Sequence, residues 1–288
     1  MDAGLVANRS NHTAVEYDSF ADIYSLWTDT AAAAQSNLSF YIQAYTATDG
    51  PIVELGVGDG RIAVEAASRG CEIVGIDVSP AMLALCRQRA KQAGVSDKIT
   101  LVEADFRNFQ LKQPAALIAL PYHSFGHLTT NRSKCQAVER IYSQLRPGGR
   151  FLFDDFLMTP QLASRMRQVQ LRAAYRSKFG TDVLLWVTSQ VDEPSQSITV
   201  VTWQDDFDAD GQLEWRRYRR LNLSWLDPEN VQQLLTETGF QINACLGDFT
   251  GSAFSADTAV EQIWDVRKPA HATSMKVIHD RNDWTKGI

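Results

Sequence analysis

The chain has 288 residues, 44% of them hydrophobic, which is enough for one large α/β core or for a core with an insertion. Its net charge of −6 argues against a nucleic-acid partner, because proteins that bind the phosphate backbone are usually basic. The sequence has no apolar run of transmembrane length, no signal-peptide pattern and no C-x-x-C pair, so we expect a cytoplasmic protein without a membrane partner.

Apolar residues at helical spacing predict helices over residues 16–46. Short apolar runs then alternate with helical patterns as far as residue 156, which predicts a parallel sheet covered by helices on both faces. The expected strands are 51–55, 72–77, 99–102, 115–120 and 150–156, and the expected helices between them include 80–92 and 131–145.

This alternation breaks after the fifth strand. Three stretches of alternating character, 183–187, 198–203 and 213–223, predict a small inserted antiparallel sheet with a turn before Gly211. A helix at 228–238 follows. Strands at 240–246 and 261–267 are then expected to close the main sheet as an antiparallel pair, which brings it to seven strands.

The segment Pro51–Arg61 carries the strongest functional signal. Gly56, Gly58 and Gly60 follow the first strand and precede a helical pattern. Glycine allows positive φ and close approach of a ligand, and the start of a helix offers free N–H groups. The next strand ends at Asp77, where nucleoside-binding units place a carboxylate for the ribose hydroxyls.

The glycine spacing also bears on which nucleoside would bind. It is G-x-G-x-G rather than the dinucleotide pattern G-x-G-x-x-G, and Glu54 stands just before the first glycine. A carboxylate about 4 Å from a pyrophosphate charge would cost roughly 4 kcal/mol at an effective dielectric near 20. An ammonium or sulfonium group would instead be attracted. S-adenosylmethionine carries both, so the local chemistry favours this cofactor over NAD and disfavours an NAD oxidoreductase.

Four ordered segments, together with the N-terminal region, resemble class I S-adenosylmethionine-dependent methyltransferases over roughly residues 15–268. The segments are Glu54–Gly60, Gly75–Met82, Val102–Phe106 and Leu145–Phe153. The resemblance implies an α/β, doubly wound, mostly parallel seven-stranded sheet of the Rossmann-like methyltransferase type. It also implies that S-adenosylmethionine is the cofactor.

The resemblance also assigns cofactor-binding roles. Glu54 and Gly56 would face the methionine part, Asp77 the ribose, and Asp105 with Phe106 the adenine. Alternatively, Asp77 is only a helix cap and Asp105 an ordinary loop acid. The full expected set is Glu54, Gly56, Gly58, Asp77, Val78, Met82, Asp105, Phe106 and Leu120.

The segment after the fourth strand, Leu120–Leu128, would lie beneath the transferring methyl group in this family. His123 could take a proton from the acceptor or orient it, since imidazole titrates near pH 6.5. Tyr122 and His127 are expected to contact substrate, although His127 could instead be packed and satisfied by backbone groups.

The N-terminal segment Glu16–Tyr24 resembles the Y-D-x-x-A-x-x-Y lid helix of small-molecule methyltransferases. The resemblance implies that Tyr17 and Tyr24 reach the cofactor carboxylate or the substrate, and we place them with His123 as candidate catalytic residues. The alternative is that both rings are simply buried as the helix packs.

Two charged clusters permit a functional and a structural interpretation. The pair Asp154-Asp155 could hold Mg²⁺, but no third acid with a matching position is evident, so we expect no metal. The run Arg216–Arg220 could recognise an anionic substrate. We favour protection of an exposed sheet edge instead.

These patterns predict four units. They are N-terminal lid helices in 1–46, a cofactor domain in 47–180 and 226–268, an inserted sheet in 181–225 that covers the substrate site, and a tail in 269–288. The inserted sheet is also a plausible homodimer surface. Within it, Trp186 and Trp203 are expected to contact a flat or ring-bearing small molecule.

The function expected from the resemblance is methyl transfer to a nitrogen of such a molecule, in secondary metabolism. An O-methyltransferase is the first alternative, and a non-catalytic module that keeps the cofactor fold is the second. Protein methylation is disfavoured, because no N-P-P-Y-type run follows the fourth strand.

Overall fold

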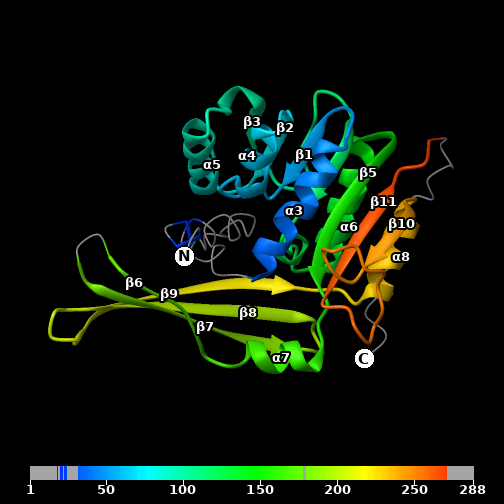
Figure 1. Cartoon of the computed structure of the whole chain (residues 1–288). Coiled ribbons are helices and arrows are strands. Elements are labelled where there is room, and N and C mark those ends of the chain that lie inside the picture. Colours follow the sequence, from blue (N-terminus) through cyan, green and yellow to red (C-terminus); the bar gives the residue numbers. More distant parts are fainter. Residues whose placement is uncertain (1–17, 19, 22, 25–31, 178–179, 271–288) are drawn as a thin grey trace, which may run out of the picture.

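The computed structural model describes residues 18–270 except 19, 22, 25–31 and 178–179 (Figure 1). Its main sheet has the strand order β10-β11-β5-β4-β1-β2-β3. All neighbouring strands are parallel except at β11, which runs antiparallel to both β5 and β10. The doubly wound, mostly parallel seven-stranded sheet predicted from the sequence is therefore confirmed. The strands are β1 Ile52–Leu55, β2 Ile73–Asp77, β3 Ile99–Glu103, β4 Ala115–Leu120, β5 Leu145–Phe156, β10 Gln241–Leu246 and β11 Glu261–Arg267.

Helices cover both faces of this sheet. The faces alternate along each buried strand: Ile118 and Leu120 of β4 pack with α6 and α8, whereas Leu117 and Ala119 pack with α3, α4 and α5. A strand buried on both faces must be apolar throughout, which is why β4 is a continuous apolar run. The helices are α3 Ala32–Thr46, α4 Arg61–Ser68, α5 Pro80–Gln92, α6 Asn131–Gln144 and α8 Pro228–Thr238.

Local signals set the helix ends. The Ser79 hydroxyl caps α5 by accepting the N–H of Met82 at 3.1 Å, and Pro80 follows it at the first helical position. Helix α8 ends at Gly239, which has a φ of 103°. Two short 3₁₀ segments, η2 Ser96–Lys98 and η3 Ser124–His127, connect α5 to β3 and β4 to α6.

The inserted sheet has four strands, so the three predicted strands were one too few. The missed strand is β6 Gln170–Arg176, and it is followed by β7 Asp182–Asp192, β8 Ser197–Phe207 and β9 Leu213–Ser224 in the order β6-β7-β8-β9. Strand β6 contains arginines and alanines and lacks β-branched residues, so its own propensity is weak. Antiparallel pairing with β7 determines its conformation instead.

The inserted sheet extends away from the α/β body as a long ribbon (Figure 1). Helix α7 Pro160–Met166 connects β5 to β6 and lies along this ribbon. Within the predicted N-terminal helical region, α3 is present, and the described residues between 18 and 24 consist of turns and short helical pieces. Among the described residues, no helix combines the length and the hydropathy needed to cross a membrane.

Candidate active site

The loop after β1 is a tight glycine turn at the carboxyl edge of the sheet. Gly56, Gly58 and Gly60 have φ values of 65°, 55° and 80°, which favour glycine. A Cβ on Gly56 would lie 2.9 Å from the Ser124 hydroxyl oxygen and 3.3 Å from the Phe106 ring. The glycine loop therefore contacts both the adenine-side segment and the segment after β4, as a cofactor lying along this edge requires.

Asp77 holds the glycine loop to the end of β2. Its carboxylate is 8% exposed and accepts the N–H of Gly58 and the N–H of Ser79, each at 2.9 Å. Ser79, and not Asp77, caps α5. Each carboxylate oxygen can accept more than one hydrogen bond, so Asp77 can still receive ribose hydroxyls.

Glu54 is a buried carboxyl group at the end of β1. It accepts a hydrogen bond from the Tyr45 hydroxyl at 2.9 Å. Burial raises the pKa of Glu54 to about 8, although Tyr45 and Arg61 oppose this shift. A cationic group bound at the end of β1 would be stabilised by the ionised form, which fits the ammonium of an amino acid.

The expected adenine segment shows one partner that the sequence did not reveal. Arg107 binds the Asp105 carboxylate through its backbone N–H at 2.9 Å and its Nε at 2.8 Å. Burial alone would raise the pKa of Asp105, but Arg107 holds it below its ordinary value. Asp105 is therefore ionised and already partnered, and its contact with adenine remains a prediction.

The three apolar residues of the expected cofactor set differ in their surroundings. Met82 is fully buried, and its methyl group lies 3.5 Å from the position of a Cβ on Gly58. Leu120 is fully buried in the core at the end of β4, so a contact with the cofactor would be made by its backbone, and this contact stays a prediction. Val78 is half-buried between Asp77 and the cap of α5.

The segment after β4 has an unusual backbone. Tyr122 and His123 both adopt the left-handed conformation, with φ values of 61° and 55°. Such a conformation costs a non-glycine residue roughly 1–2 kcal/mol and is often found at functional sites. Asp154 offsets this cost by accepting both of their N–H groups, at 3.0 and 2.9 Å, while Tyr41 donates its hydroxyl to Asp154 at 2.5 Å.

These contacts show what the acidic pair at the end of β5 does. Asp154 anchors the segment after β4, and Asp155 accepts the N–H of Phe156 at 2.9 Å. In the described part of the chain, no group of three His, Cys, Asp or Glu residues is arranged to hold a metal ion.

His123 forms an ion pair that the sequence did not reveal. Its Nε2 lies 2.8 Å from a carboxylate oxygen of Glu261 and 3.8 Å from Asp154, and its ring stacks on Phe156 at 4.0 Å. Burial by itself would lower the pKa of His123. The attraction of the Glu261 and Asp154 carboxylates together outweighs burial and raises the pKa to about 9. His123 is therefore an imidazolium at neutral pH. Glu261 lies 138 positions further along the chain, at the start of β11, and only the fold brings it here.

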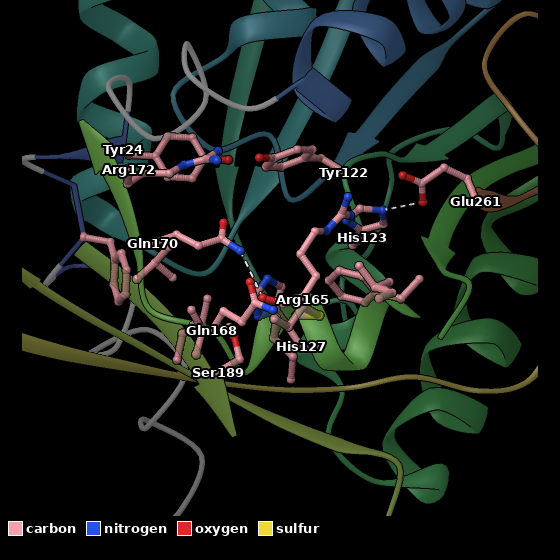
Figure 2. Close-up of a pocket in the computed structure, with 18 of the residues that line it drawn as sticks. Tyr24, Tyr122, His123, His127, Arg165, Gln168, Gln170, Arg172, Ser189 and Glu261 are labelled. Carbon is pink, nitrogen blue, oxygen red and sulfur yellow. Dashed lines mark hydrogen bonds and ion pairs between the residues drawn. The ribbon is translucent and has the colours of Figure 1, made fainter. Parts of the chain in front are cut away.

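A cavity of about 530 Å³ lies between this ion pair and the inserted sheet (Figure 2). Tyr24, Tyr122, His123, His127 and Glu261 are among the residues that line it. The inserted sheet and the segment that leads into it supply the other walls. The residues from β7, β8 and β9 are Val187, Ser189, Val200, Leu221 and Leu223.

Trp186 and Trp203 do not line this cavity, so their predicted contact with substrate is not supported. They are cross-strand partners whose stacked rings lie 6.3 Å apart. Neighbouring residues of a strand point to opposite faces, and Val187 faces the cavity. The two tryptophans therefore lie on the outer face of the inserted sheet, where Arg216 packs over Trp203 and pairs with Asp205.

His127 and the two tyrosines complete the set of predicted residues. Burial and the nearby Lys134 lower the pKa of His127 to about 3, so its ring is neutral. His127 also lines the cavity. Tyr24 lies between the cavity and the glycine loop, with its hydroxyl 3.6 Å from the position of a Cβ on Gly58. Tyr17 lies outside the described residues.

Comparison with known proteins identifies the domain that contains the glycine loop and Asp77. Residues 52–149 match the family model described as "Methyltransferase domain". These residues form a methyltransferase domain, in agreement with the resemblance to class I S-adenosylmethionine-dependent methyltransferases. It is 24% identical over 245 residues to the "Putative methyltransferase YqeM" of Bacillus subtilis, which covers 84% of this chain and 93% of that protein.

Two solved structures share the fold of this methyltransferase. CcbJ from Streptomyces caelestis superposes with a TM-score of 0.73 and 19% identity, over 90% of this chain and 99% of CcbJ. KedS8 from Streptoalloteichus, described as a sugar N-methyltransferase, superposes with a TM-score of 0.66 and 15% identity, over 93% of this chain and 99% of KedS8.

The cofactor of this methyltransferase is S-adenosylmethionine. The residues present fit it: the glycine loop leaves no room for a side chain at Gly56, Asp77 is a buried carboxylate at the end of β2, and Phe106 offers a ring beside the loop. Tyr24 stands where the cofactor edge meets the cavity, so the cavity lies on the side from which an acceptor would approach.

Proposed function

We propose that this methyltransferase methylates an amine nitrogen of a small, ring-bearing molecule. The observation that carries the proposal is the His123–Glu261 ion pair, which lies in the cavity beside Tyr122 and Phe156. A carboxylate in a partly aromatic cavity is suited to bind an amine, because it accepts the N–H groups of an ammonium or amine. The naming of KedS8 as a sugar N-methyltransferase agrees with this assignment.

The bound cofactor supplies a methyl group on a sulfonium, whose sulfur leaves as a neutral thioether. The protein's part is to align the acceptor and exclude water, and such positioning supplies on the order of 7–11 kcal/mol. The Asp154 carboxylate fixes the backbone of Tyr122 and His123, and Glu261 fixes the imidazole ring. The acceptor therefore meets a rigid wall at the end of β4.

The same ion pair favours nitrogen over oxygen as the acceptor. A hydroxyl group must lose its proton as it attacks, so it needs a base close by. His123 is protonated at neutral pH because its pKa is about 9, and it therefore cannot serve as that base. A neutral amine attacks without help and releases its proton afterwards, with Glu261 in position to accept the N–H.

The test is a methyl-transfer assay with purified protein, S-adenosylmethionine and matched cyclic amines, alcohols and phenols, with products identified by mass spectrometry. We expect N-methyl products, and we expect Asp77→Ala to abolish them by removing the residue that fixes the glycine loop. Exclusive O-methylation would contradict the proposal. Saturable cofactor binding without turnover of any acceptor class would support a non-catalytic module instead.

A further inference from the structure

The part of the cavity lining that comes from β7, β8 and β9 is aliphatic. The lining residues of these strands are Val187, Val200, Leu221 and Leu223, together with Ser189. We call these residues the aliphatic patch. None of them carries a charge, whereas the loops and the main sheet contribute the His123–Glu261 ion pair to the same cavity (Figure 2).

The pairing of the strands makes the aliphatic patch continuous. Ser189 is the cross-strand partner of Val200, and Val200 is the partner of Leu221, so these three residues form one row across β7, β8 and β9. Val187 lies two positions before Ser189, and Leu223 lies two positions after Leu221. Both therefore point to the same face of the sheet, one on each side of the row.

The aliphatic patch continues toward the ion pair. Val200 and Leu223 belong to a hydrophobic cluster against which Phe156 and Met166 pack, and Phe156 and Met166 also line the cavity. The ring of Phe156 stacks on His123 at 4.0 Å. A single ligand can therefore contact the ion pair and the aliphatic patch across an apolar surface.

The aliphatic patch offers few partners to a polar ligand. Among its described side chains, the Ser189 hydroxyl is the one hydrogen-bonding group. The backbone of β8 is paired with β7 along one edge and with β9 along the other. A ligand hydroxyl over Val200 would therefore lose its hydrogen bonds to water without replacing them. An alkyl group in the same place would release water from apolar surface, which is favourable.

We infer that the acceptor carries an aliphatic group that covers the aliphatic patch. The inference rests on the proposed function, which places the amine of the same molecule at the His123–Glu261 pair. The substrate class is therefore an alkyl-substituted cyclic amine and not an amine on a ring surrounded by hydroxyl groups.

The test measures calorimetric binding to the protein saturated with S-adenosylhomocysteine. The probes are piperidines that carry a methyl, a butyl or a terminal hydroxypropyl group at the ring carbon opposite the nitrogen. We expect the butyl probe to bind at least about tenfold more tightly than the methyl probe, because each buried methylene contributes about fourfold. The hydroxypropyl probe has the same length and should lose most of this gain. The heat-capacity change of binding should be most negative for the butyl probe.

Three variants assign the gain to residues. Val187→Thr places a hydroxyl in the aliphatic patch and should reduce the preference for butyl over methyl. Val191→Thr is the matched control, because Val191 is half-buried on the same face of β7 but does not line the cavity, and it should preserve the preference. Ser189→Val should tighten binding of the butyl probe, a gain that misfolding cannot produce. Affinity for S-adenosylmethionine should be unchanged in all three variants.

The inference and the proposed function can fail separately. No binding of the butyl probe, no gain over the methyl probe, or an equal gain from the hydroxypropyl probe overturns the inference, even if piperidine is N-methylated. An equal loss of preference in Val187→Thr and Val191→Thr overturns it too. A gain that depends on Val187, in a protein that methylates the matching butylcyclohexanol and no amine, would uphold the aliphatic site and reject the proposed function.

Discussion

At the scale of single residues, two carboxylates hold the segment after β4 that lines the cavity. Asp154 accepts the N–H groups of Tyr122 and His123, which stabilises two left-handed residues in succession. Glu261 orients the His123 ring. The predicted role of His123 as a proton acceptor does not suit this arrangement, because the ring is protonated at neutral pH. An orienting role, the other part of that prediction, is compatible with it.

Glu261→Gln should lower the pKa of His123 from about 9 toward its ordinary value, because the variant removes the main attraction that opposes burial. Histidine titration followed by NMR measures this directly. A raised pKa in the folded state stabilises fully below about pH 6.5 and is lost as the pH rises through about 9. The stability advantage of the wild type should therefore shrink by about 1–3 kcal/mol between pH 6 and pH 10.

The control for that titration is His127, whose pKa is already lowered by burial and Lys134. Its resonances should not titrate in this range in either protein. An unchanged His123 midpoint in Glu261→Gln would show that Asp154 alone sustains the charge.

At the scale of elements, the glycine loop and the inserted sheet have different structural roles. The loop brings the ends of β1 and β2 together around a backbone with no side chain at Gly56 and Gly58. The inserted sheet presents one face to the cavity and exposes the other, where the tryptophan pair stacks. Successive side chains of each strand point to opposite faces of the sheet, so substitutions at neighbouring positions can test which face binds the acceptor.

Gly56→Ala should weaken S-adenosylmethionine binding by about tenfold or more, because its Cβ would lie 2.9 Å from the Ser124 hydroxyl and displace the segment after β4. Calorimetric titration gives the affinity. Gly94→Ala is the matched control: Gly94 has a φ of 70° but no atom within 4 Å of an added Cβ. It should cost only the left-handed strain of about 1–2 kcal/mol in stability, with normal affinity. If Gly56→Ala and Gly94→Ala bound S-adenosylmethionine equally well, any loss of affinity would come from backbone strain alone and not from the added Cβ at Gly56.

Ser189→Trp should block acceptor binding, since Ser189 is buried and lines the cavity. Its neighbour Gln190 is exposed on the opposite face of β7, so Gln190→Trp should leave the acceptor KM unchanged. Cofactor affinity should be normal in both variants, which separates blockage of the cavity from misfolding. Similar KM values for the two variants would place the acceptor elsewhere.

At the scale of the whole molecule, the cavity belongs to neither sheet alone. Glu261 and His123 come from the main sheet and its loops, whereas Val187, Ser189 and Val200 come from the inserted sheet. Under the proposed function the acceptor would lie between the two sheets, next to the edge at which β1, β2 and β4 end.

Ligand linkage gives a test at this scale. S-adenosylmethionine at a hundred times its Kd should raise the stability of the wild type by about 2.7 kcal/mol, because it binds only the folded state. For a chain of this size each kcal/mol shifts the Tm by about 2–4 °C, so thermal unfolding should shift by roughly 5–10 °C. NAD should give no shift, and neither should S-adenosylmethionine with Asp77→Ala. A shift by NAD alone would contradict the cofactor assignment.

The sequence by itself determined the main sheet, its strand order along the chain and the glycine loop with Asp77, because these depend on local periodicity and on turn residues at fixed spacing. Only the tertiary structure could place Glu261 beside His123 and Arg172 at a bulge facing the cavity. These contacts join elements whose separation along the chain carries no spacing rule, or depend on a register that pairing alone sets. The face on which Trp186 lies was decided by that register too, because a shift of one residue reverses every side chain of a strand.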